Sequence, residues 1–364
     1  MGRLPEILET ILLRRGVAAA DMASFLYPSL EDLALPEDLP GIVEAADVVL
    51  DAIAANRRVV VFGDYDCDGV CATAIVVKAL ESLGARVQPF LPERLSEGYG
   101  MSDASVSRML SEHVGVGLVI TVDNGINSIA QIAALKEKGV SVVVTDHHLP
   151  GEKLPAADAL VDPRVAAPPH LADLCGAGVA FLLANRLVAE AKRRGVYSGP
   201  SVGGPLLVLA GLATVTDIMP LVGQNRIIVS EALKRFGAWA PLGLKELYSR
   251  AARIGCDRLT SRDFGFLLGP RINAAGRLAS GMDALDLILE TNRERAREYA
   301  LRIDLNNTER KSIEIKMTEE ALGKVVPGAP AQVIDLPNGH PCLKTCWCTH
   351  GLLRTTAFPR NMPN

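Results

Sequence analysis

Short apolar runs alternate with amphipathic stretches between residues 57 and 163. The apolar runs predict β-strands at 57–62, 85–92, 117–122, 140–145 and 159–163. The amphipathic stretches predict helices at 71–84, 103–114 and 128–139. Strands that are apolar on both faces and are joined by helices indicate a mostly parallel sheet flanked by helices on both sides. The predicted fold class is therefore α/β.

After residue 166 the pattern becomes mainly helical and stays so to about residue 285. A highly charged segment follows at 286–326, and its dense glutamate, arginine and lysine content predicts one long exposed helix. Helices of that length commonly connect two domains. The predicted division is an N-terminal helical extension at 1–40, a main domain at 41–285, the connector helix at 286–326 and a remnant of a second domain at 327–364.

Acidic signatures follow directly on several of the apolar runs. They are Asp64, Asp66 and Asp68 in DYDCDG, Asp123 in VDNG, Asp146, His147 and His148 in TDHH, and Asp217 in TVTDIMPL. In open parallel sheets the ligand crevice lies beyond the carboxyl ends of the strands. Carboxylates at the ends of buried strands are costly unless something positive lies among them. A pair of divalent metal ions is the simplest candidate, which points to a metal-dependent phosphoesterase.

The spacing within DYDCDG suggests how its carboxylates converge. Asp64, Asp66 and Asp68 stand at alternate positions, so in an extended segment they would point the same way, with Gly69 allowing a tight turn into the next helix. Oxygen ligands suit Mg²⁺ or Mn²⁺, and imidazole shifts the preference toward Mn²⁺. Asp123, on the predicted central strand, is the best-placed residue to bridge two ions about 3.5–4 Å apart.

Each motif also has a structural interpretation. DYDCDG resembles an Asp-rich turn or a partial EF-hand loop, although the EF-hand needs a glutamate at position 12 and a preceding helix. The histidine pair would suit a surface or a core, and Asp217 would suit a helix end. Three acidic signatures at strand ends together favour the metal site.

Two further segments carry groups suited to nucleic acid. Arg94 and Tyr99 stand in a glycine-containing loop, where they would hold a phosphate and stack on a base. Arg271, Asn273 and Arg277 stand among small residues in GPRINAAGRL and would suit a phosphodiester backbone. An ordinary surface loop and a structural arginine network are the alternatives for these two segments.

Composition and charge limit the class of protein and its cellular compartment. Hydrophobic residues make up 49% of the 364 residues, enough for a large core. The formal net charge of −4 gives no general affinity for nucleic acid, but a local basic groove around an acidic site is compatible with it. Scattered cysteines without a C-x-x-C pair or a signal peptide predict a reduced, cytoplasmic protein. The apolar stretches are too short to predict a membrane span.

Taken in order, DYDCDG, VDNG, TDHH and TDIMPL, together with EGYGM and GPRINAAGRL, resemble the DHH phosphoesterase superfamily. Within it the chain is most similar to the RecJ-type single-stranded-DNA-specific exonucleases, over about residues 40 to 335. The resemblance implies a 5′→3′ exonuclease that degrades single-stranded DNA with Mn²⁺ or Mg²⁺ in recombination and repair. It also implies a substrate with a 5′ phosphate, a single-strand-binding protein and a helicase as partners, and a monomer.

The resemblance assigns roles residue by residue. It implies that Asp68, Asp123, His147 and Asp217 hold one ion, and that Asp66 and Asp123, with Asp64, hold the other. Asp123, Asp146 and His148 would be catalytic, with His148 on the scissile phosphate. Arg94 would read the 5′ phosphate, and the remaining DNA contacts would be Tyr99, Arg271, Asn273 and Arg277.

The last residues depart from the family pattern. Residues 330–341 look like the beginning of a second domain, but the 23 residues that follow have no such likeness, which predicts a truncated or frameshifted ending. We therefore expect Mn²⁺ binding but weak digestion of long single strands. The alternatives are a DHH phosphodiesterase for short oligonucleotides or cyclic dinucleotides, and a non-catalytic DHH scaffold.

Overall fold

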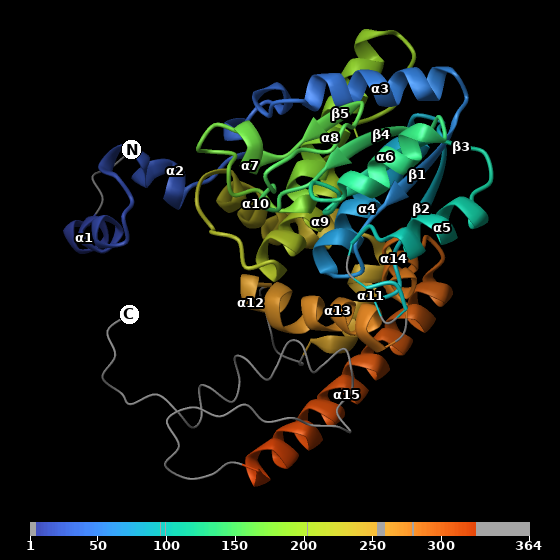
Figure 1. Ribbon diagram of the computed structural model, residues 1–364. Helices are drawn as coiled ribbons and strands as arrows, with labels where there is room; N and C mark the ends of the chain where they lie inside the picture. The colour runs from blue at the N-terminus through green and yellow to red at the C-terminus, as the bar shows by residue number, and fades with distance from the viewer. Residues whose placement is uncertain are drawn as a thin grey trace.

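The computed structural model describes residues 5–94, 96–98, 100–201, 203–252, 259–278 and 280–324. The predictions made for Tyr99 and for the second-domain remnant at 327–364 lie outside these residues. Within the described part, an α/β body carries a helical subregion, a short N-terminal arm and one long helix (Figure 1).

Five parallel strands form the sheet that positions the acidic signatures. They are β1 (Arg58–Phe62), β2 (Arg86–Phe90), β3 (Val116–Val122), β4 (Ser141–Thr145) and β5 (Ala159–Val161). Their order in the sheet is β2-β1-β3-β4-β5, and every described pairing is parallel. The predicted mostly parallel sheet is confirmed, and β3 is its central strand.

Alternate side chains of the strands build two separate cores, because successive side chains point to opposite faces of a sheet. Val59, Val61 and Ile120 pack into one cluster with α3 (Ile42–Ala54), α4 (Cys67–Ser82) and α8 (Gly176–Arg193). Val60 and Val119 pack into the other with α5 (Asp103–Glu112) and α6 (Ile129–Glu137). The strands are apolar on both faces because both faces are covered.

The helical subregion lies beside the carboxyl edge of the sheet, and its later helices, within residues 242–289, lie below the sheet in Figure 1. Its elements are α7 (Pro163–Ala166), α9 (Gly203–Thr216), α10 (Gly223–Trp239), α11 (Leu242–Ala251), α12 (Ser261–Asp263), the π-helical turn η4 (Phe264–Leu268), α13 (Gly269–Leu278) and α14 (Gly281–Leu289). Helix α9 is buried along most of its length and packs against α4, α8 and α10. This burial places its C-terminal end, which leads into Asp217, next to the sheet edge.

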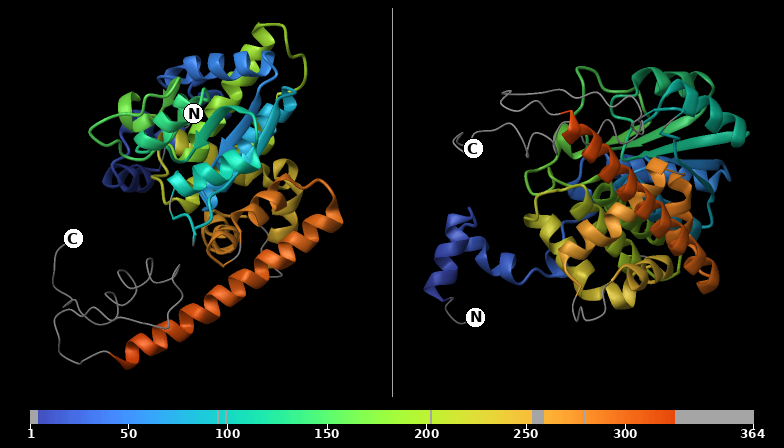
Figure 2. Two further views of the ribbon diagram at one scale, coloured as in Figure 1. Left: turned by 45° about the vertical axis from the view of Figure 1, so that its right-hand side comes forward. Right: turned by 90° about the horizontal axis from the view of Figure 1, so that it is seen from below.

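The two ends of the described chain extend from this body. The N-terminal arm consists of α1 (Glu6–Arg14), η1 (Ala19–Asp21), α2 (Met22–Leu26), η2 (Leu30–Asp32) and η3 (Pro36–Asp38). Helix α15 (Arg293–Gly323) runs across α11, α13 and α14 and continues past them (Figure 2). Within the described residues, no helix combines the length and apolarity that crossing a bilayer requires.

The long helix begins later than the sequence predicted. Residues 286–289 end α14, and Asn292 then caps α15 by accepting hydrogen bonds from the backbone amides of Glu294 and Arg295. An asparagine at this position satisfies amides that a helix leaves unpaired in its first turn. The charged pattern identified the helix, but it did not separate it from the preceding one.

Candidate metal centre

The carboxylates of DYDCDG converge, but not through an extended segment. Asp64 follows β1, whereas Asp66 is the N-cap of α4 and Asp68 lies in its first turn. Oδ1 of Asp66 accepts hydrogen bonds of 3.0 Å from the amides of both Asp68 and Gly69. The predicted alternation along an extended chain is therefore wrong: the helix begins at Cys67, and its first turn replaces the extended geometry.

Gly69 has a different role from the predicted turn. It lies inside α4, and a Cβ at this position would lie 2.5 Å from the carbonyl oxygen and 2.6 Å from the amide nitrogen of Asp64. No side chain fits in that space, so the glycine allows α4 to pack against the end of β1. The close contact brings Asp64 and Asp68 to the same site.

Asp123 directly follows the central strand and has a φ of 62°, a left-handed conformation that is uncommon for a residue other than glycine. The N-terminus of α8 lies against it, since a Cβ on Gly176 would come within 2.6 Å of Cβ of Asp123. The same helix end binds Asp68, whose two carboxylate oxygens accept 2.7 Å hydrogen bonds from the amides of Gly176 and Ala177. The sequence predicted this helix but not that its first amides bind Asp68, although the small residues in CGAG were a usable signal.

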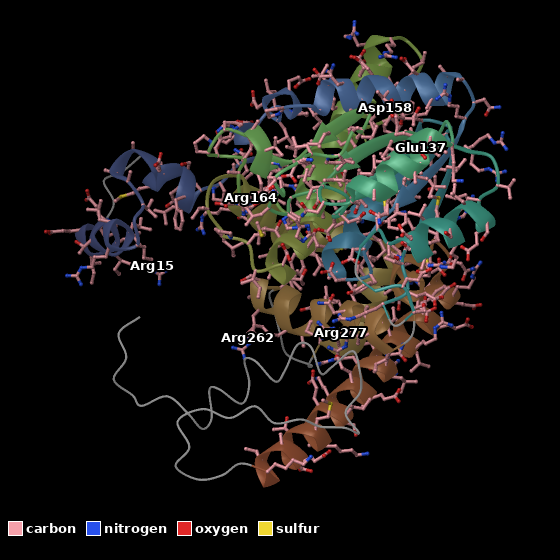
Figure 3. The ribbon with its side chains drawn as sticks, in the orientation of Figure 1. Arg15, Glu137, Asp158, Arg164, Arg262 and Arg277 are labelled. Carbon is pink, nitrogen blue, oxygen red and sulfur yellow. The ribbon has the colours of Figure 1, made fainter. Side chains whose placement is uncertain are left out.

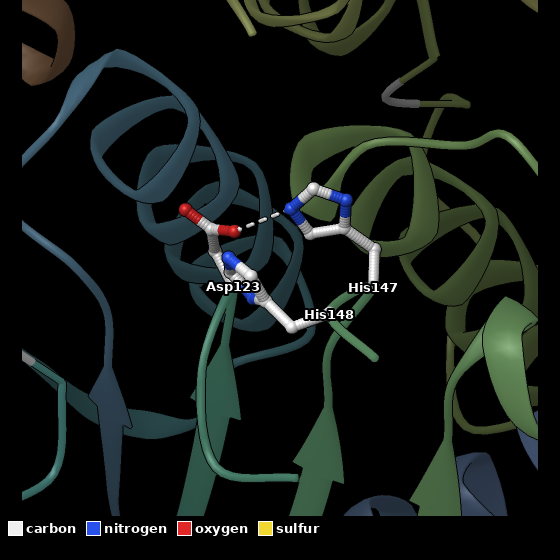
Figure 4. Close-up of side chains that lie close together, drawn as sticks. All are labelled: Asp123, His147 and His148. Atoms are coloured by element: carbon white, nitrogen blue, oxygen red, sulfur yellow. Dashed lines mark ion pairs between the residues drawn. The ribbon is translucent and has the colours of Figure 1, made fainter. Parts of the chain in front are cut away.

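His147 lies at the centre of the acidic cluster. Its Nε2 is 3.0 Å from Oδ1 of Asp123, 3.5 Å from Oδ2 of Asp68 and 3.8 Å from Oδ2 of Asp217. Figure 4 shows the imidazole reaching toward Asp123 above the ends of the strands. Burial lowers the pKa of His147, which favours the neutral imidazole that can bind a metal ion. The four residues predicted for one ion do meet.

His148 lies beside His147, with the centroids of the two rings 4.5 Å apart, and is held by Asp146. Its Nδ1 lies 2.7 Å from Oδ1 of Asp146, and this hydrogen bond raises the pKa of His148 to about 9. Asp146 also accepts hydrogen bonds from the amides of Ile126 and His147. Burial opposes its ionisation, but the bond from His148 and these amides hold the pKa of Asp146 below its ordinary value. Asp146 thus orients the charged imidazole of His148 through this hydrogen bond.

The acidic groups provide the donor sets that a divalent cation needs. Among the described residues, atoms within reach of a common ion occur in three sets: Asp64, Asp66 and Asp123; Asp68, His147 and Asp217; and Asp123, His147 and His148. Both carboxylate oxygens of Asp64 are buried and accept no hydrogen bond from the described residues. Such unpartnered buried oxygens fit a cation, because a buried carboxylate without one is costly.

Burial and mutual repulsion make these carboxylates weak acids in the protein without an ion. Burial, together with the charge of Asp66, raises the pKa of Asp64 to about 8. Burial and the charge of Asp68 raise the pKa of Asp217 to about 7 and that of Asp123 well above its ordinary value. A cation reverses this effect, because opposite charge favours the ionised form.

Asp162 is an additional acidic group at the same edge that the sequence analysis left out. It follows β5, its Oδ1 accepts a hydrogen bond from the amide of Arg164, and its Oδ2 is buried without a partner among the described residues. Burial raises the pKa of Asp162 to about 7. Its position just after a strand, like those of Asp64, Asp123 and Asp146, was the signal that could have found it.

The residues predicted to contact DNA fall into different environments. The guanidinium of Arg94 lies over the ring of Tyr65, 5.2 Å from its centroid. Arg277 lies on α13 near the same tyrosine, on the face shown in Figure 3. Arg271, in contrast, donates from Nε to Asp304 of α15 at 2.9 Å and from Nη1 to the carbonyl of Leu267.

Comparison with known proteins finds a family match over the segment that carries most of this site. The model of the DHH family, N-terminal domain, matches residues 58–201, which contain every strand and the aspartates and histidines from Asp64 to His148. A parallel sheet with carboxylates and imidazoles at its carboxyl edge, in the segment that this family matches, defines the class as the DHH proteins.

Relatives and solved structures narrow the class further. The single-stranded-DNA-specific exonuclease RecJ of Dickeya dadantii (strain 3937) is 40% identical over 328 residues, 88% of this chain and 56% of that protein. A crystal structure of an exonuclease RecJ bound to manganese has a TM-score of 0.75 at 37% identity and covers 84% of this chain and 76% of that one. RecJ in complex with Mn²⁺ from Thermus thermophilus has a TM-score of 0.80 at 33% identity, over 96% of this chain and 49% of that one.

The chain belongs to the RecJ family. This confirms the resemblance found in the motifs. The chain spans about half the length of the curated relatives it matches, 56% for the Dickeya dadantii protein.

Proposed function

We propose that this chain carries the catalytic region of a 5′→3′ exonuclease that hydrolyses single-stranded DNA with two Mn²⁺ or Mg²⁺ ions. The observation that carries the proposal is the meeting of Asp68, Asp123 and Asp217 within 4 Å of Nε2 of His147. The family supports the substrate, since the Dickeya dadantii relative is named a single-stranded-DNA-specific exonuclease and solved relatives carry manganese or magnesium.

Two ion sites fit the donor geometry. In the first, the ligands would be Asp68, Asp123, His147 and Asp217, and in the second they would be Asp64, Asp66 and Asp123. Asp123 belongs to both sites, which suits a bridging carboxylate. When bound, two such ions would supply an activated water nucleophile and neutralise charge on the phosphate.

The chain's own residues then orient and hold the substrate. His148 carries a proton at neutral pH, because its pKa is raised to about 9 by Asp146, and a cationic imidazole suits a contact with the scissile phosphate. Arg94 and Arg277, near Tyr65 at the Asp64 end of the site, suit the terminal 5′ phosphate. The roles of Tyr99 as a base-stacking residue and of Arg271 as a DNA contact stay predictions.

The domain organisation, location, oligomeric state and partners belong to the same proposal. The main domain at 41–285 would be the DHH domain, with α15 as the connector to a second domain. Cytoplasmic location, a monomeric state and partners such as a single-strand-binding protein and a helicase remain predictions from the sequence.

Substrate length tests the function. The 364-residue chain would be incubated with Mn²⁺ and a 5′-phosphorylated single-stranded 30-mer, a 5-mer, a dinucleotide or a cyclic dinucleotide. We expect release of 5′ mononucleotides from the oligonucleotides, faster from the 5-mer than from the 30-mer. Preference for the dinucleotide or cyclic dinucleotide would favour the phosphodiesterase alternative, and no turnover of any substrate, with DNA or protein binding retained, would favour the scaffold.

A further inference from the structure

The amides at the start of α4 have one partner close in sequence and one that is distant. A helix leaves its first amides without intrahelical acceptors. Oδ1 of Asp66 accepts from the amides of Asp68 and Gly69, but the first amide of the helix, that of Cys67, donates to Oδ1 of Asn273 at 2.7 Å. Asn273 lies on α13, 206 residues away in sequence. The cap of this metal-site helix is therefore completed from outside.

Helix α13 also contacts the backbone between the two aspartates. A Cβ on Gly276 would come within 2.4 Å of the carbonyl oxygen of Tyr65, and one on Gly281, at the start of α14, within 3.3 Å of Cα of the same residue. Both glycines bring helix backbone directly against the loop that carries Asp64 and Asp66. The Asn273 hydrogen bond thus forms within an extended, closely packed contact.

The other end of α13 lies beside the segment that carries Asp217. A Cβ on Gly269, the first residue of α13, would lie 2.3 Å from Cγ2 of Thr216. Arg271 then ties the helix to Asp304 of α15. One helix therefore contacts the loop of one predicted ion site and the end of α9 that leads to the other.

We propose that Asn273 is a positioning residue of the metal centre: its amide oxygen holds the first turn of α4, and so keeps Asp66 and Asp68 at the distance that ion binding requires. The proposal rests on the proposed metal-dependent function, and it gives Asn273 a role other than the DNA contact suggested by the motif. With Oδ1 of Asp66 occupied by two amides, its other oxygen is the one left to face an ion.

Mn²⁺ binding is the direct test, because it does not require turnover. Free Mn²⁺ would be titrated by electron paramagnetic resonance against the parent chain, Asn273→Ala, Asn273→Asp and Asn292→Ala. Asn292→Ala is the matched control, since it removes the same kind of asparagine cap from α15, away from the acidic cluster. We expect Asn273→Ala to weaken Mn²⁺ binding about tenfold, as for other residues that orient metal ligands. The Mn²⁺ affinity of Asn273→Asp, which keeps the acceptor oxygen, should stay within about threefold of that of the parent. The affinity of Asn292→Ala should match that of the parent.

Three results would overturn the proposal. Parent-like Mn²⁺ affinity of Asn273→Ala, with weaker binding of a 5′-phosphorylated 12-mer, would make Asn273 a DNA contact. An equal loss of Mn²⁺ affinity in Asn273→Asp would show that the acceptor oxygen is not responsible for the effect. If far-UV circular dichroism finds Asn273→Ala unfolded, the comparison of Asn273→Asp with the parent decides the case. Absence of Mn²⁺ binding in the parent would remove both the metal site and this role, whereas Mn²⁺ binding without nuclease activity would count against the proposed function alone.

Discussion

The two sides of the metal centre differ in the partners of their acidic groups. On the histidine side, which consists of Asp146, His147 and His148, Asp146 accepts hydrogen bonds from backbone amides and from His148. On the aspartate side, which consists of Asp64 and Asp66, both oxygens of Asp64 are buried without a donor among the described residues. The protein's own hydrogen-bond donors stabilise the negative charge of Asp146, whereas burial disfavours the charge of Asp64, which a cation would stabilise.

Removing the residue shared by both predicted ion sites should have the largest effect. Asp123→Ala should abolish mononucleotide release and weaken Mn²⁺ binding by more than about 100-fold, the upper end for residues that only orient ligands. The measurements are turnover of the 5-mer and the Mn²⁺-induced rise in Tm. The control is Glu137→Gln, a change at an exposed residue of α6 that Figure 3 labels. A normal Mn²⁺-induced rise in Asp123→Ala would contradict the two-ion arrangement.

The stability of the protein should depend on Mn²⁺ and pH together. The folded-state pKa values of Asp64 and Asp217, about 8 and about 7, lie above the ordinary value of 3.8, so the folded protein binds more protons than the unfolded chain. Without metal, these groups lower stability progressively as the pH rises from about 4 to 8. Because Mn²⁺ competes with their protons, the Mn²⁺-induced rise in Tm should be larger at pH 8 than at pH 6. Thermal melts with Mn²⁺ and with EDTA at both pH values give this difference; an equal rise at both would argue against these carboxylates as ligands.

Removing the charge of Asp146 on the histidine side should have a larger effect on the pKa of His148 than on Mn²⁺ binding. Asp146→Asn removes the charge that raises the pKa of His148, so we expect that pKa to fall from about 9 toward its ordinary value of 6.5. The alkaline limit of 5-mer turnover should fall with it, and imidazole NMR resonances would report the titration directly. An unchanged His148 titration in Asp146→Asn would mean that other groups set its charge.

A smaller effect is expected on the aspartate side. Asp64→Asn removes a buried carboxylate, so the metal-free protein at pH 8.5 should gain about 1–2 kcal/mol in the free energy of unfolding. The same change should reduce the rise in Tm that Mn²⁺ produces. Urea denaturation with EDTA, compared between pH 5 and pH 8.5, measures the first effect, and a loss of stability at pH 8.5 would show that Asp64 has a partner within the protein.

Much of the fold followed from local pattern. Runs such as RRVVVF and GLVITV are apolar throughout because both faces of the sheet are covered, and they therefore predicted their strands. The parallel arrangement of these strands places Asp64, Asp123 and Asp146 at one edge of the sheet. The positions of these residues relative to the strands are local properties, so the sequence sufficed. The course of DYDCDG was predicted wrongly, because the helix begins at Cys67 and not after residue 70.

The sequence by itself determined which side chains reach the carboxyl edge of the sheet, because strand direction and residue order follow from short-range preferences. Only the tertiary structure decided their partners. Asp68 is bound by the amides of Gly176 and Ala177, more than 100 residues away, and Cys67 by Asn273. Arg271 contacts Asp304 of α15. Such pairings depend on how separate helices pack, and packing is set by the whole core, which no single segment of the chain encodes.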